Sequence, residues 1–225
     1  MISLSEHISE SILSSTHTGK AGIEDMMRQY GLDPKKATLN ADGSIDYNDD
    51  VNWGDRHLTK LPFKFRKVNG KFNISYNYLT SLEGCPEEVN GHFYCDNNKL
   101  TSLNGGPKRI NGGFFCMCNG LTSLEGGPEQ VGGEYNCSQN KLTSLNHCPK
   151  VIKYAFYCVY NHLTSLEGGP EQVGFDYACS YNDLTSLEGL PKKLNNYFYC
   201  YDNPGQFTKE DVLAVCKVNK NKIRV

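Results

Sequence analysis

A strict 21-residue repeat constrains the fold of this chain more than any other feature. A leucine recurs at this spacing, and a second leucine follows three residues later in every unit. The first leucines of the units are Leu58, Leu79, Leu100, Leu121, Leu142, Leu163 and Leu184. From the second unit on, every unit opens with Leu-Thr-Ser-Leu, and proline falls in phase. A fixed period of this length predicts a solenoid, in which each unit buries its apolar side chains against its neighbours.

Each unit also contains one short segment in which buried and exposed positions alternate. An aromatic residue, a variable residue and a small apolar residue follow one another, which predicts a half-buried strand. The aromatic and small residues are Phe72/Ile74, Phe93/Cys95, Phe114/Cys116, Tyr135/Cys137, Phe156/Cys158, Tyr177/Cys179 and Phe198/Cys200. An asparagine stands three residues later, where we expect its buried amide to bond the backbone of neighbouring turns. Each unit should therefore form one strand and one turn-rich return path.

These positions resemble the consensus of the leucine-rich-repeat superfamily, L-x-L-x-x-N-x-L-x-x-L, with an aromatic residue and cysteine in place of the first two leucines. The wording Leu-Thr-Ser-Leu-Glu-Gly-Gly-Pro is similar to the bacterial and bacteriophage variants, in particular those of T-even-like phages. The resemblance implies a solenoid with a short-stranded parallel sheet and an irregular convex side. It divides the chain into an N-terminal segment (1–57), seven repeats (58–204) and a C-terminal helix and tail (205–225).

The flanking segments are predicted to cap the solenoid. Residues 2–13 and 20–30 have the apolar periodicity of short helices. Residues 39–45 contain an Asp-Gly turn typical of a hairpin, and Val51-Asn52-Trp53 precedes the first strand by one full period, so it should act as a capping strand. At the other end, Thr208–Asp211 resembles a capping box that opens a short helix. We expect an α/β cap in front and a helical cap behind.

Composition and charge exclude several classes of protein. The 23 Lys and Arg residues are balanced by 25 Asp and Glu, for a formal net charge of −2, whereas nucleic-acid binders usually carry a basic excess. No apolar run approaches the length of a membrane span, and the first residues do not resemble a secretion signal. We expect a cytoplasmic protein with ten reduced cysteines and neither a nucleic-acid nor a membrane partner.

Six cysteines spaced one strand apart, from Cys95 to Cys200, suggest either a metal array or a stack of small buried side chains. Metal ligands converge from different directions, whereas side chains in register on parallel strands point the same way. This favours the core interpretation, because free cysteine packs as a small hydrophobe. Cys85 and Cys148 lie three repeats apart, roughly 14 Å by the strand spacing, which is too far for a disulfide.

The other candidates for chemistry are isolated. Residues 40–49 partly resemble a calcium loop, but Thr38 stands where the first carboxylate should be, so a hairpin turn is the better interpretation. Cys118 and Cys216 do not belong to the series of six cysteines spaced one strand apart, which we call the cysteine ladder. We expect Cys118 to be exposed. The histidines show no metal-ligand spacing, and no nucleophile, phosphate or dinucleotide motif is present. We therefore predict no catalytic residue, metal or cofactor, and no enzymatic activity.

The residues that vary within the repeat are more informative for function. Positions between and just after the buried strand residues should point outward, onto the concave face of the sheet. The apolar and aromatic residues among them are Tyr94, Phe115, Met117, Tyr157, Val159, Tyr199 and Tyr201. Exposed apolar strips tend to mark interaction sites, although such side chains also stabilise a sheet by stacking along it. We predict that this strip binds another protein.

The leading hypothesis is a phage protein that binds and inhibits a host or antiviral defence protein in the host cytoplasm. An alternative arises at the N-terminus, which resembles the capsid-targeting peptides of T-even-like phage internal proteins. These peptides are cleaved after a triplet such as Ile8-Ser9-Glu10, and this resemblance implies a packaged virion protein. A third class, the bacterial leucine-rich-repeat ubiquitin ligases, is disfavoured because only 21 residues follow the last repeat. The sequence leaves the partner's identity and the oligomeric state open.

Overall fold

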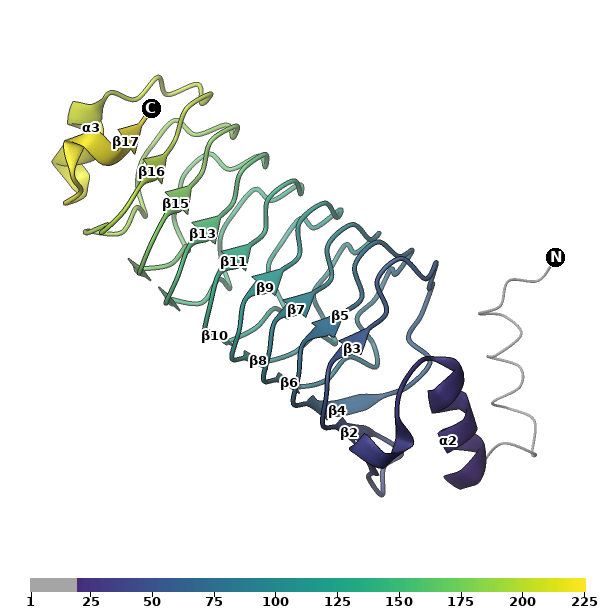
Figure 1. The fold of residues 1–225 in the computed structure, drawn as a ribbon. Coiled ribbons are helices and arrows are strands. Elements are labelled where there is room, and N and C mark those ends of the chain that lie inside the picture. Colours follow the sequence, from purple (N-terminus) through teal and green to yellow (C-terminus); the bar gives the residue numbers. More distant parts are fainter. Residues whose placement is uncertain (1–19) are drawn as a thin grey trace.

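The computed structural model describes residues 20–225 as a parallel β-solenoid (Figure 1). Its turns stack along one axis, from helix α2 (Lys20–Gln29) at one end to helix α3 (Lys209–Val215) at the other. This confirms the repeat solenoid predicted from the 21-residue period. The helix expected over residues 2–13 and the cleavage triplet at residues 8–10 lie outside the described residues.

A nine-stranded parallel sheet runs the length of the molecule, with one strand per turn. Its strands are β3 (Val51–Asn52), β5 (Phe72–Asn73), β7 (Phe93–Tyr94), β9 (Phe114–Phe115), β11 (Tyr135–Asn136), β13 (Phe156–Tyr157), β15 (Tyr177–Ala178), β16 (Phe198–Tyr199) and β17 (Ile223–Arg224). Within the repeats each residue pairs with the residue 21 positions away, as Phe72 does with Phe93. Val51 pairs with Phe72 in the same register, which confirms the strand predicted at Val51-Asn52-Trp53.

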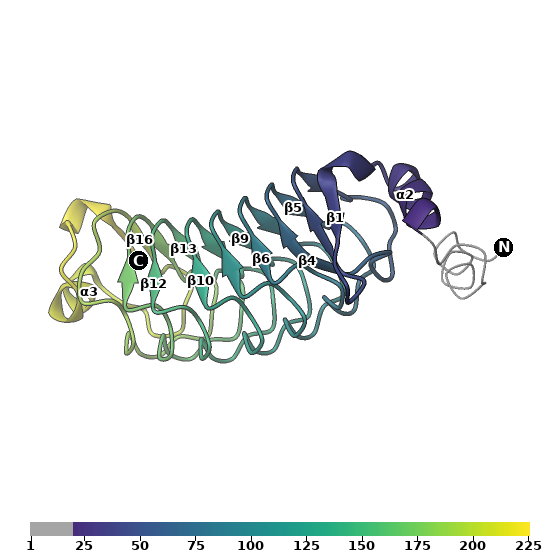
Figure 2. The ribbon, with the colours of Figure 1, turned by 90° about the horizontal axis from the view of Figure 1, so that it is seen from below.

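A second sheet lines the return path of most turns, where the sequence led us to expect irregular structure only (Figure 2). Its first block contains β1 (Ala37–Leu39), β2 (Ile45–Tyr47), β4 (Phe65–Val68), β6 (Glu88–Val89), β8 (Arg109–Ile110) and β10 (Gln130–Val131). A separate pair contains β12 (Val151–Ile152) and β14 (Gln172–Val173). The expectation of one strand per unit was wrong, because most strands of the second sheet have a single buried residue, which shows no alternation.

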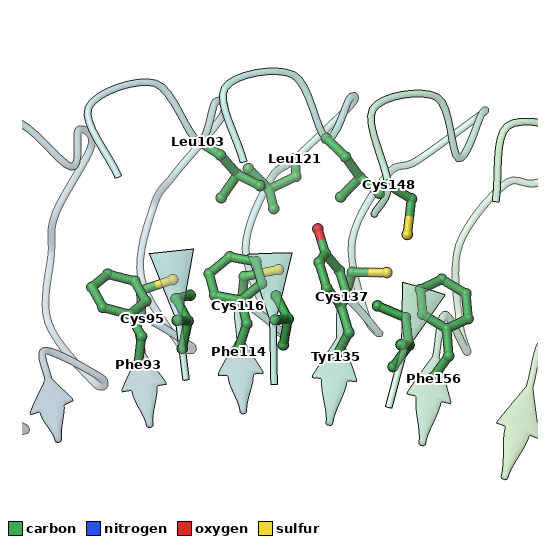
Figure 3. Packing of buried hydrophobic residues seen from close by; sticks show 14 of the residues in the cluster. Phe93, Cys95, Leu103, Phe114, Cys116, Leu121, Tyr135, Cys137, Cys148 and Phe156 are labelled. Atoms are coloured by element: carbon green, nitrogen blue, oxygen red, sulfur yellow. The ribbon is translucent and has the colours of Figure 1, made fainter. Parts of the chain in front are cut away.

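Apolar side chains from both sheets and the leucines of the Leu-Thr-Ser-Leu segments fill the space inside each turn. The inward aromatic rings lie one above the other, and Phe72 and Phe93 are stacked with ring centroids 5.7 Å apart. The sulfur atoms of Cys95, Cys116 and Cys137 point the same way in successive turns (Figure 3). The ladder cysteines are free and buried, which confirms their predicted place in the core. Truncating one inward phenylalanine to alanine in such a core costs about 3–5 kcal/mol.

The asparagine after each strand bonds the backbone of neighbouring turns, as predicted. The Nδ2 group of Asn140 donates to the carbonyl oxygens of Cys116, Cys137 and Ser138 at 3.0–3.2 Å. Its Oδ1 accepts the backbone N–H of Leu121 at 3.1 Å. One amide thus bonds four backbone groups, among them the Leu121 N–H, and it fixes the turn to its predecessor.

The two ends of the described chain carry the elements that the sequence predicts there. At the front, Trp53 is fully buried and its Nε1 donates to the carbonyl oxygen of Tyr30, just after α2. A 3₁₀ turn (Pro34–Lys36) and the antiparallel β1–β2 hairpin follow. At the back, Thr208 and Asp211 form the capping box of α3, and a 3₁₀ turn (Lys220–Lys222) leads into β17. Neither helix described in residues 20–225 has the length and hydropathy of a membrane span.

Candidate protein-binding surface

The side chains predicted to bind a partner lie on the outward face of the nine-stranded sheet. In each strand the first residue points into the core and the second points out, so that Phe93 is fully buried while Tyr94 is half-buried. Phe115, Tyr157 and Tyr199 occupy the same outward position in their strands. Met117, Val159 and Tyr201 follow two residues later in their turns, half-buried or exposed. We call these seven residues, together with the aromatic side chains beside them that are described below, the outward aromatic surface.

The N-terminal part of this surface is a compact cluster. The rings of Tyr94 and Phe115 are stacked, with centroids 4.7 Å apart and planes 9° from parallel. His92 lies beside both rings, at 5.8 and 6.0 Å, and its Nδ1 accepts the backbone N–H of Gly113. Stacking of this kind stabilises the sheet by itself, but it also leaves a rigid aromatic ridge with little rotamer entropy to lose on binding.

The C-terminal part is richer in tyrosine than the sequence analysis predicted. Tyr160 and Tyr181 are stacked with ring centroids 4.2 Å apart, and Tyr181 meets Tyr201 edge to face at 5.4 Å. Tyr197 and Tyr199 form another pair at 5.7 Å. Because the Tyr160 hydroxyl lies beside that of Tyr181, it raises the pKa of Tyr181 to about 12. Tyr160, Tyr181 and Tyr197 were not among the residues predicted from the sequence.

The missed residues Tyr160 and Tyr181 stand in an unusual backbone position. In each repeat, the residue immediately before the asparagine that bonds neighbouring turns has a left-handed conformation with φ between 53° and 55°. Tyr76, Tyr160 and Tyr181 occupy this position, where bulky side chains are disfavoured. All three are exposed, Tyr76 to 61%. Aromatic residues at a strained and exposed position indicate a role outside the core. The three tyrosines are separated by multiples of 21 residues, and this spacing could have identified them from the sequence.

Two outward positions divide the surface. Asn136 interrupts the aromatic series between Phe115 and Tyr157, and Ala178 interrupts it between Tyr157 and Tyr199. Ala178 is nevertheless only 5% exposed, because the larger side chains of the neighbouring turns cover it. The structure therefore places the seven predicted residues on one face, but Asn136 and Ala178 interrupt the strip that they form.

Acidic groups border the C-terminal group. Burial raises the pKa of Tyr157, and the carboxylates of Glu134 and Asp176 raise it further. Asp176 accepts hydrogen bonds from the Asn196 amide and from the backbone N–H of Tyr197. Burial also raises the pKa of Glu134. This end of the face thus offers phenol hydroxyls and carboxylates together.

Two basic side chains, Lys222 and Arg224, lie over a tyrosine ring of this part of the surface. The guanidinium carbon of Arg224 lies 5.2 Å from the ring centroid of Tyr197, and the Lys222 ammonium lies 5.8 Å from it. Both distances are within the range of cation–π attraction. Tyrosine faces on this surface can therefore accept basic groups.

The other candidates of the sequence analysis have structural roles. In the suspected calcium loop, the Asp42 carboxylate accepts hydrogen bonds from Ser44 and pairs with Lys64, which lowers the pKa of Asp42. Cys216 is buried and Cys118 is half-exposed. Among residues 20–225, no group of three or more histidine, cysteine or acidic side chains is placed to hold a metal ion.

Comparison of the sequence with protein-family models finds no match, and comparison with curated proteins likewise finds no similar sequence.

Proposed function

We propose that the protein is a non-enzymatic binding module of the leucine-rich-repeat type, and that its outward aromatic surface holds another protein. The observation that carries this proposal is the placement of Tyr76, Tyr160 and Tyr181, exposed in a strained backbone conformation that the repeat does not require of tyrosine. Tyrosine supplies a large, rigid contact area together with a hydroxyl group, which makes it common in binding surfaces.

A mutant series tests the proposal. A variant with Tyr94→Ser, Tyr157→Ser and Tyr199→Ser removes one aromatic ring from three different turns. We expect it to lose capture of the partner in pull-downs from host lysate, while its circular dichroism and unfolding midpoint show a folded chain.

The matched control changes three exposed threonines of the repeat motif, with Thr101→Ala, Thr143→Ala and Thr164→Ala. This variant should capture the partner as the unchanged protein does. Equal capture by both variants would refute a role for the outward aromatic surface.

By analogy with the phage proteins that the repeats resemble, the partner is a host or antiviral defence protein that is bound and inhibited in the host cytoplasm. The triplet Ile8-Ser9-Glu10 supports a second candidate, a protein packaged into the virion. Mass spectrometry of purified particles separates the two. A chain that begins at Ser11 in particles favours packaging, whereas absence from particles, or an intact Met1, contradicts it.

A further inference from the structure

The second sheet contains a seam between β10 and β12. In the turn before the seam, four backbone N–H groups donate to carbonyl oxygens of the preceding turn at 2.8–3.3 Å. They belong to Glu129, Gln130, Gly132 and Gly133. The turn after it repeats the same four bonds from Glu171, Gln172, Gly174 and Phe175. The equivalent amides at the seam belong to Lys150, Val151, Lys153 and Tyr154. Within the described chain these four have no backbone acceptor on the preceding turn.

The loss of a glycine explains the seam. Glycine occurs in the dipeptide that follows the strand of the second sheet in each repeat turn that is hydrogen-bonded to its predecessor there. These dipeptides are Asn90-Gly91, Asn111-Gly112, Gly132-Gly133 and Gly174-Phe175. In each of these dipeptides a Cβ on the glycine would lie 2.1–2.8 Å from backbone atoms of the preceding turn, so one residue without a side chain is needed for close approach. Lys153-Tyr154 contains no glycine, and neither does Asn195-Asn196, where the second sheet ends.

Two adjoining grooves of about 400 and 460 Å³ follow the seam on the outside of the molecule. They share Glu129 and Lys150, and together they extend from Gly126 and His147 to Gly132 and Lys153. At the rise of an extended chain, seven residues of wall correspond to roughly 20 Å. The combined groove therefore runs parallel to β10 and β12 and is long enough for an extended segment of about six residues.

The walls of the groove offer three kinds of contact. The backbone amides of Lys150, Val151, Lys153 and Tyr154 donate no backbone hydrogen bond to the turn of β10. Lys108, Lys150 and Lys153 line the groove against a single acid, Glu129. Val151 is 47% exposed at a position where its neighbours in register, Arg109, Gln130 and Gln172, are polar.

We propose that this seam binds an extended, acidic peptide segment of a partner protein by strand addition. The segment would take up the free donors and acceptors of the two strands, as peptides do at open sheet edges. Because β10 and β12 share no backbone hydrogen bond, the segment does not have to replace one between them. The excess of lysine selects acidic side chains, and Val151 accepts an apolar one. This site lies on a different sheet from the outward aromatic surface and does not depend on it.

Amide hydrogen exchange tests whether the seam is open in solution. Exchange at Lys150, Val151, Lys153 and Tyr154 should be at least about tenfold faster than at Glu171, Gln172, Gly174 and Phe175, one turn later, since only the latter have acceptors in the sheet. Equal protection of the two sets would mean that the seam is closed, and it would overturn the proposal.

Binding is tested with a fluorescein-labelled peptide of alternating glutamate and valine, six residues long. We expect it to bind at least about tenfold tighter than the matching lysine–valine peptide, and to slow exchange at the four seam amides. Anisotropy without a change up to about 1 mM peptide, a concentration that still detects very weak binding, would overturn the proposal. Equal affinity for the two peptides would overturn it as well.

Three variants locate the peptide. Tyr154→Gly restores the dipeptide found at Asn111-Gly112, so it should close the seam, protect the four amides and weaken binding about tenfold. Lys150→Glu should weaken binding of the acidic peptide about fivefold or more through charge alone. Tyr157→Ser, on the outward aromatic surface, should leave binding unchanged. If Tyr157→Ser weakens binding as strongly as Tyr154→Gly does, the peptide occupies the other surface and the seam is not its site.

Discussion

Cys118 differs from the other nine cysteines of the chain because it alone is not buried. Burial raises the pKa of most of the buried thiols, to about 12 for Cys137 and about 11 for Cys216, so their reactive thiolate forms are suppressed. We expect N-ethylmaleimide to label one thiol in the native protein and all ten after denaturation, as counted by intact mass. Cys118→Ser should abolish the native labelling.

The pH dependence of that reaction follows from the same environment. Partial burial raises the pKa of Cys118 above its ordinary value, so its thiolate fraction at pH 7 is lower than that of a free cysteine. The labelling rate should rise about tenfold per pH unit until the raised pKa is reached. A rate that levels off near pH 8 would contradict this environment.

Tyr135 and Tyr177 are inward aromatic residues whose fully buried hydroxyl groups have no hydrogen-bond partner. The same register holds phenylalanine in neighbouring turns, so the hydroxyl is not needed for packing. Because an unpaired buried polar group costs free energy, Tyr135→Phe should raise the free energy of unfolding by about 1 kcal/mol. Urea titration measures the change, and Phe114→Tyr, the reverse change one turn earlier, should lower the stability.

At the scale of single elements, the asparagine ladder replaces hydrogen bonds that two-residue strands cannot make. Asn140→Ala removes four hydrogen bonds to backbone groups. The three carbonyl oxygens keep other donors, in Asn119, Asn161 and the Cys118 amide, so that only the Leu121 N–H is left unpaired. Since an unpaired buried group costs about 1–3 kcal/mol, we expect a loss of stability of about that size. Asn146→Ala changes an exposed asparagine and should cost less than about 0.5 kcal/mol. Similar unfolding midpoints for the two variants would show that the ladder is dispensable.

The strands of the second sheet lack the alternation that predicts a strand, although a buried valine or isoleucine recurs in them. Val68, Val89, Ile110, Val131, Ile152 and Val173 recur at 21-residue spacing and are buried. Apart from Ile152, which follows Val151, each stands alone between polar residues or glycine. No alternation therefore marks these residues as parts of strands. Only the stacking of turns pairs these residues into strands, because the hydrogen bonds join residues 21 positions apart.

At the scale of the whole molecule, the turns contact mainly their immediate neighbours, so stability should be transmitted turn by turn. Val212 is fully buried in α3 at the C-terminal end. Placing a charge there by Val212→Asp should open the adjoining turns first. Hydrogen exchange should therefore accelerate more in β16 and β17 than in β5 and β7. Uniform acceleration along the solenoid would contradict this local coupling.

Much of the candidate binding surface could be derived from the sequence, but its grouping could not. Period-2 alternation placed Tyr94 and Tyr157 on the outward face, because neighbouring residues in a strand point to opposite sides. The same rule does not reach Tyr160 and Tyr181, since they follow the strand in a left-handed conformation that alternation does not describe. Their stacking depends on the distance between turns and is visible only in three dimensions.

The 21-residue period by itself determined that the chain stacks into a solenoid, since a unit this short has no other way to bury its leucines, aromatic residues and cysteines. It also determined which residues form the core and which asparagines hold the turns together. Only the tertiary structure decided that the return path forms a second sheet, and that this sheet opens where Lys153-Tyr154 replaces a glycine-containing dipeptide. The physical reason is that close approach between turns depends on backbone atoms 21 residues apart, and a local pattern contains no information about that distance.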